Sequence, residues 1–128
     1  MDMNKSFGVD KASAEEGKWF DLEMGGKVKV SKLSCLAFKT EVVRLQKPHL
    51  ALLQSTMDSS EILNDITITA MSRTILLDWS DINLDGEPLE HSVDNAKMLM
   101  TEYPDFTEVI SGLATDRRNF MPTELAGK

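Results

Sequence analysis

Apolar residues recur at the spacing of an amphipathic helix in four segments of the chain, residues 34–47, 58–79, 93–102 and 105–119. In the first segment, Phe38, Val42 and Leu45 mark one face of a helix, and Leu36 and Val43 flank it. The charged residues between them are expected to face water. The pattern therefore predicts a mainly α fold, a small helical domain of about four helices.

The segment at residues 58–79 carries apolar residues on two faces. One face has Ile62, Ile66, Ala70 and Leu77, and the other has Ile68, Met71, Ile75 and Trp79. A helix that is apolar on two sides is central to a fold or is partly covered by an oligomer. Asp58 or Ser59 is expected to cap its start. Residues 66–69 are also compatible with a strand, but the length of the segment and its caps favour a helix.

Residues 18–31 alternate as in a β-hairpin around Gly25-Gly26, which adds an N-terminal hairpin to the helices. A two-residue loop would pair Glu23 with Val28, a charged residue with an apolar one. A three-residue loop gives the pairs Glu23–Lys27, Leu22–Val28, Asp21–Lys29 and Phe20–Val30. We favour the longer loop because it separates charged from apolar pairs. A lone hairpin is marginally stable, so its apolar face must pack on helices or on a neighbouring subunit.

The connection after Trp79 matches the first half of a calcium-binding loop. Asp81, Asn83, Asp85 and Gly86 fit positions 1, 3, 5 and 6 of an EF-hand loop. Position 12 is Ser92 instead of the closing glutamate, so a calcium-responsive module is only our third hypothesis. We predict instead a tight turn at Asp85-Gly86, with glycine at positive φ, and a helix N-cap at Ser92.

The two ends of the chain lack a periodic pattern. Residues 1–16 are polar, and residues 121–128 have little to hold them in place. We predict flexible tails over both segments, on either side of a single domain at residues 17–120. No apolar run approaches the ~18 residues of a membrane span, and the first residues lack the apolar region of a signal peptide.

Composition narrows the classes of partner. The chain has 128 residues and a net charge of −7. Nucleic acids and anionic membranes attract clustered lysine and arginine, so we expect neither as a partner. Cys35 is the sole cysteine, which excludes an internal disulfide and fits a reducing compartment.

Residues that commonly carry catalysis are sparse. His49 and His91 are far apart in the sequence, and each lies beside a helix end where structural histidines are common. Cys35 lies at an apolar helix start, where an inert buried thiol is commoner than a nucleophile. One cysteine and two histidines do not make a zinc site without carboxylates at undefined spacing. We predict no enzymatic activity, no metal and no cofactor.

Short motifs nevertheless follow one another in a recognisable order. They are Gly17–Phe20, Arg44–Pro48, Trp79, Asp81-Ile82, Asp85-Gly86, Pro88, Ser92–Ala96, Asp105-Phe106 and Asp116–Phe120. This order, over residues 15–120, resembles the tail assembly chaperones of long-tailed bacteriophages with non-contractile tails.

The resemblance implies a non-enzymatic assembly factor in the host cell cytoplasm. Such chaperones bind the tape-measure protein and keep it soluble while the tail tube polymerises, and they are typically absent from the mature virion. The resemblance also implies self-association into an oligomer or spiral. Contact with the tail tube protein would come through a longer form made by ribosomal frameshifting. Apolar grooves and a charged exterior suit a partner that exposes long apolar stripes.

We predict contact surfaces on the hairpin, on the helix after Asp58 and on the C-terminal helices. The predicted partner-binding residues are Phe20, Leu22, Val28, Val30, Ile68, Met71, Ile75, Trp79, Met98, Phe106 and Phe120. The alternative interpretation is that these residues build one core. The alternative function is another small structural or connector protein of the phage tail, which would remain in the particle.

Overall fold

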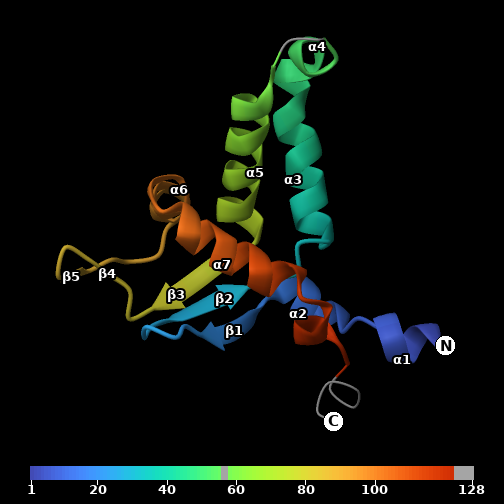
Figure 1. The fold of residues 1–128 in the computed structure, drawn as a ribbon, viewed down its shortest axis with the longest axis vertical. Coiled ribbons are helices and arrows are strands. Elements are labelled where there is room, and N and C mark those ends of the chain that lie inside the picture. Colours follow the sequence, from blue (N-terminus) through green and yellow to red (C-terminus); the bar gives the residue numbers. More distant parts are fainter. Residues whose placement is uncertain (56–57, 123–128) are drawn as a thin grey trace.

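Helices and antiparallel strands together build the fold, which a computed structural model describes over residues 1–55 and 58–122 (Figure 1). The prediction of a mainly α domain with one hairpin is wrong. In the described residues, a three-stranded antiparallel sheet of order β1-β2-β3 and a separate two-stranded sheet accompany the helices. The protein therefore has a mixed α/β fold.

Residues 1–16 form two short helices, although the sequence shows no period there. They are α1 (Met3–Phe7) and α2 (Lys11–Glu16). Ala14 of α2 is buried, and its carbonyl accepts a hydrogen bond from the backbone N–H of Lys32 at 2.9 Å. The segment that we predicted as a flexible tail thus packs against the rest of the domain in this structure.

The predicted hairpin is confirmed, and its strands are β1 (Lys18–Asp21) and β2 (Lys27–Val30). Its register differs from our prediction by two residues. Phe20 pairs with Val28 and Asp21 with Lys27, so residues 22–26 form the loop. A shift of two residues keeps every side chain on the same face of the sheet. The observed register also pairs Lys18 with Val30 and Trp19 with Lys29, so the separation of charged from apolar pairs selected the wrong register.

A helical arm stands away from the sheet (Figure 1). It consists of α3 (Leu36–Gln46), the 3-10 helix η1 (Lys47–His49), α4 (Leu50–Leu53) and α5 (Ser60–Thr74). α3 and α5 lie side by side and turn back at the far end. The predicted helix at residues 34–47 is confirmed with nearly the predicted bounds. Pro48 lies in the 3-10 helix, as expected for a residue that cannot continue an α-helix.

The helix predicted for residues 58–79 is only partly right. Its start is confirmed, since Asp58 Oδ1 accepts from the N–H of Ser60 at 3.0 Å. However, α5 ends at Thr74, and the chain continues as β3 (Leu76–Ser80), antiparallel to β2. Ile75 and Trp79 fit a helix face as well as a strand, so the pattern did not show this junction. Pairing decides it, because β3 satisfies the backbone groups on the free edge of β2.

A second hairpin forms the connection after β3. Its strands are β4 (Asn83–Leu84) and β5 (Glu87–Pro88). Asp85 and Gly86 between them have φ values of 53° and 82°. Two successive positive φ values are those of a type I′ turn, which matches the twist of a two-residue hairpin. The predicted tight turn is therefore confirmed.

The remaining elements are α6 (Val93–Glu102), α7 (Pro104–Thr115) and the 3-10 helix η2 (Arg117–Phe120). Ser92 caps α6 as predicted, because its hydroxyl accepts from the N–H of Asn95 at 3.0 Å. α7 crosses the sheet beside α6 (Figure 1). Of the predicted C-terminal tail, residues 123–128 lie outside the described residues.

The core lies between the three-stranded sheet, the C-terminal half of α5, and α6 with α7. Its fully buried side chains include Val30, Ile75, Leu76, Met100 and Ile110. In contrast, α3 and α4 contribute no buried residue. The body of the protein is therefore packed, whereas one side of the arm is not.

Candidate interaction surface

The apolar residues predicted as partner contacts belong to the packed body. Most are buried, with no more than 7% of the residue surface exposed: Val28, Val30, Ile68, Met71, Ile75, Trp79 and Phe120. The others are partly buried against the same core: Phe20, Leu22, Met98 and Phe106. In this structure these side chains stabilise the chain's own fold, and their role as partner contacts stays a prediction.

Trp79 and His91 fix the second hairpin to the body. The Trp79 Nε1–H donates to the carbonyl of Leu89 at 2.7 Å, and the two aromatic rings meet edge to face with centroids 4.9 Å apart. His91 Nε2 lies 3.1 Å from the carbonyl oxygen of Leu76 and donates to it in the tautomer that carries the proton there. His91 therefore has a structural role in this connection.

The other candidates for chemistry are also separated. Cys35 is only 2% exposed, and its Sγ lies 3.9 Å from the hydroxyl of Ser31. His49 lies in η1 at the far end of the arm. Over residues 1–55 and 58–122, no three His, Cys, Asp or Glu side chains are grouped so as to hold a metal ion. Within the same residues, no helix has both the length and the apolar character needed to cross a membrane.

The outer side of the arm exposes apolar side chains. Leu36, Val43 and Leu50 expose 69%, 58% and 46% of their surfaces. They recur at every seventh residue along α3, η1 and α4. Two helical turns bring a side chain back to nearly the same face, so Leu36 and Val43 share one face of α3, and Leu50 follows in α4, beyond the 3-10 helix. We call this set the apolar row.

Basic side chains accompany the apolar row. Lys39, Arg44 and Lys47 lie in the same stretch of chain. Glu41, the acidic residue of α3, accepts hydrogen bonds from Arg44 and, at 2.6 Å, from Arg73 Nη1. The Arg44 guanidinium first, and that of Arg73 second, lower the pKa of Glu41 below its ordinary value. The α3 side of the arm is thus locally basic on an acidic protein, and the Arg73 bond ties α3 to α5.

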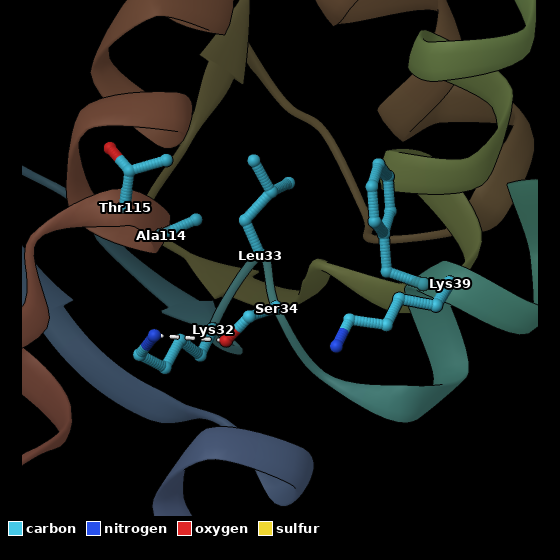
Figure 2. Close-up of a pocket in the computed structure, with 7 residues that line it drawn as sticks. Lys32, Leu33, Ser34, Lys39, Ala114 and Thr115 are labelled. Atoms are coloured by element: carbon cyan, nitrogen blue, oxygen red, sulfur yellow. Dashed lines mark hydrogen bonds between the residues drawn. The ribbon is translucent and has the colours of Figure 1, made fainter. Parts of the chain in front are cut away.

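A shallow groove lies at the base of the arm, between the start of α3 and the end of α7 (Figure 2). Its volume is about 390 Å³, and its lining residues are Lys32, Leu33, Ser34, Phe38, Lys39, Ala114 and Thr115. Leucine, phenylalanine and alanine supply apolar walls, and the two lysines supply ammonium groups. None of the lining residues carries a carboxylate. We call this site the base groove.

Direct bonds hold the two sides of the base groove together. The N–H of Leu33 donates to the carbonyl of Ala114 at 2.9 Å, which joins the segment before α3 to α7. Glu15 of α2 fixes the start of α3, because both of its carboxylate oxygens lie 3.1 Å from the backbone N of Leu36. The N-cap residue itself, Cys35, makes no side-chain cap bond. The groove is therefore set by contacts between segments distant in sequence.

The fold and this surface define a small mixed α/β protein with a helical arm whose α3 side exposes apolar and basic side chains. The chain belongs to the YdaY prophage protein family, whose model matches residues 32–127, so the protein is phage-derived. The matched residues contain the arm, the base groove and the C-terminal helices, and they begin after β2. Neither the curated proteins nor the solved structures contain a significant match.

The sequence held a signal for part of this surface that we missed. The seven-residue spacing of Leu36 and Val43 is visible in the sequence, but we placed both residues at the flanks of the predicted helix face. The base groove left no such signal. It depends on a bond between Leu33 and a residue of α7, and no local pattern shows that pairing.

Proposed function

We propose that this protein is a tail assembly chaperone of a long-tailed bacteriophage, and that it binds the tape-measure protein and keeps it soluble while the tail tube polymerises. The observation that carries the proposal is the apolar row. Exposed apolar residues that recur along a helical arm are typical of a surface that another protein covers. A tape-measure protein is a partner of the right kind, because its long helices expose apolar stripes.

The geometry of the row suits a helical partner. Helix-in-groove recognition uses anchor residues one and two turns apart along a helix. Leu36 and Val43 are two turns apart on α3, so a side chain of an adjacent helix could pack between them, and Leu50 extends the apolar surface into α4. The phage origin of the family and the order of the sequence motifs support the same proposal.

The proposal has further parts. The protein has no enzymatic activity, acts in the host cell cytoplasm during assembly and is left out of the mature virion. Copies of it associate into an oligomer or spiral along the tape-measure protein. A longer form, made by ribosomal frameshifting, contacts the tail tube protein. Neither nucleic acid nor a membrane is a partner.

Co-expression with the tape-measure protein of the same prophage tests the proposal. Wild-type protein should keep the tape-measure protein in the soluble fraction and copurify with it. The double variant Val43→Ser/Leu50→Ser should lose this effect, because hydroxyls replace two anchors of the apolar row. The matched control is Val93→Ser/Val109→Ser, since these valines are similarly exposed, at 42% and 45%, but lie outside the arm. Circular dichroism should show both variants folded.

Two results would count against the chaperone. One is a tape-measure protein that stays insoluble in the presence of the wild-type chain. The other is a stoichiometric amount of the chain in purified virions, measured by mass spectrometry. The second result would support the alternative function, a small structural or connector protein of the tail.

A further inference from the structure

The base groove combines apolar walls with two ammonium groups that have no ion-pair partner. The ion pairs of the described residues join Arg44 and Arg73 to Glu41, Lys97 to Asp65, and Arg118 to Asp116. The ammonium group of Lys32 donates to the hydroxyl of Ser34, at 2.9 Å. Lys39 is exposed and extends beside the groove (Figure 2). In a chain with a net charge of −7, this local excess of positive charge needs a reason.

Lys39 also joins the base groove to the apolar row. It follows Leu36 by three residues and precedes Val43 by four, and residues at these spacings are neighbours on a helix surface. The groove and the row are therefore adjacent parts of one surface. Apolar side chains run along this surface, and basic side chains lie at its edge.

We infer that the base groove receives an acidic amphipathic helix of a partner protein. Apolar side chains of that helix would fill the space between Leu33, Phe38 and Ala114, and its carboxylates would pair with Lys32 and Lys39. The inference rests on the proposed function for a helical partner, and it adds the charge and the binding site of the segment. A groove of about 390 Å³ suits a few side chains of a single segment.

Charge and polarity favour this partner over other anionic ones. A nucleic acid would offer phosphates but no apolar side chains for the walls, and its many charges would be repelled by the acidic protein. A membrane surface attracts clusters of four or more basic residues, about twice what the groove offers. An acidic helix meets both requirements. Screening beyond about 8 Å at physiological ionic strength leaves the charges beside the groove as those that the helix senses. They are the two lysines, which outnumber the single carboxylate of Glu15 at the start of α3.

Fluorescence anisotropy with labelled synthetic peptides tests the inference on the full chain. The probe is an amphipathic peptide of about 18 residues, or five helical turns, with a leucine stripe and glutamates on the other faces. The comparison peptide has lysine in place of each glutamate. The glutamate peptide should bind, and the lysine peptide should not. Raising the salt from about 0.1 M to 1 M should weaken binding, because the Debye length falls from about 10 Å to 3 Å.

Variants locate the binding site. Lys32→Glu/Lys39→Glu should weaken binding of the glutamate peptide about tenfold, which corresponds to 1.4 kcal/mol. The control Lys5→Glu/Lys11→Glu changes the net charge equally at two exposed lysines outside the groove, and it should bind as wild type does. Thr115→Trp keeps both lysines but fills the groove, and it should also weaken binding. Thermal melts establish that each variant is folded.

Three outcomes would overturn the inference. They are equal binding of both peptides, unchanged binding by the Lys32/Lys39 variant, and tighter binding of duplex DNA or phosphatidylserine vesicles than of the glutamate peptide. Failure of the inference is distinguishable from failure of the proposed function. If the tape-measure protein copurifies but the groove variants bind it normally, only the groove assignment fails. If the groove binds the peptide but the tape-measure protein does not copurify, the proposed function fails.

Discussion

Removing the Glu15 carboxylate tests whether α2 supports the arm. In the structure, both oxygens of this side chain accept from the N–H of Leu36, the first residue of α3. No side chain of the N-cap residue competes for that role. Glu15→Ala should therefore destabilise α3 at its start and loosen the wall of the base groove that α3 provides.

The expected loss of stability follows from the geometry. Replacing a side chain that caps a helix N-terminus by alanine costs about 0.5–2 kcal/mol. A carboxylate near a helix N-terminus contributes about 0.3–1 kcal/mol through the helix dipole, and the two effects overlap. Glu15 and Leu36 are both exposed, so water competes for the bond and screens the charge. We expect the free energy of unfolding to fall by about 1 kcal/mol, and Tm by about 3–5 °C.

Urea titration and thermal melts measure this loss. Glu16→Ala is the matched control, because Glu16 is the exposed neighbour of Glu15 in α2. The two substitutions change the charge and the helix propensity in the same way. Hydrogen exchange should show faster exchange of the Leu36 amide in Glu15→Ala but not in the control. Equal stability of the two variants, together with unchanged exchange at Leu36, would refute the view that α2 caps the arm.

Three further predictions concern the core, the pH response and a helix cap. Phe120→Ala should lower the free energy of unfolding, measured in urea, by about 3–5 kcal/mol because removal of the buried ring leaves a cavity. The control Val109→Ala, at an exposed site, should change it by less than about 0.5 kcal/mol. Similar losses in the two variants would contradict this prediction. The folded pKa of Glu41 is lowered, so its contribution to stability is present above the unfolded pKa of 4.5 and is lost as pH falls through the folded value. Glu41→Gln should therefore be less stable than wild type at neutral pH and approach it below about pH 4 in thermal melts, and a constant difference would refute the argument. Ser92→Ala should cost about 1 kcal/mol in urea and speed amide exchange at Asn95, and unchanged exchange there would argue against the cap.

Local chemistry made the short connections predictable. Asp85-Gly86 predicted its turn because few residue pairs adopt two positive φ values, and Ser92 predicted a helix start because its hydroxyl satisfies a free N–H. The strand β3 was not predictable in the same way. Its apolar residues fit two periodicities, and only pairing with β2, far away in the sequence, selects the strand.

The candidate surface was harder to predict than the fold. The pattern of apolar residues in the sequence identifies side chains that avoid water, but it does not indicate whether the same chain or a partner protein covers them. Trp79 and Phe120 are covered by their own chain, whereas Leu36 and Val43, which only flanked the predicted helix face, remain exposed. No local period in residues 1–16 indicated the burial of Ala14, because its packing depends on Lys32.

The pairing of β2 with β3 has a consequence for how far the protein can extend. Val30 and Leu76 face each other across the sheet. The chain segment between them, which contains the arm, therefore begins and ends at adjacent positions of the sheet. The buried residues of α5 begin only at Ile66, and α3 has none. The distal halves of α3 and α5 therefore contribute no buried residue to the core. Adding or removing the same number of helical turns in α3 and α5 would change the length of the arm by about 5.4 Å per turn and leave the sheet unchanged. The length of the arm would then be an adjustable property of this architecture.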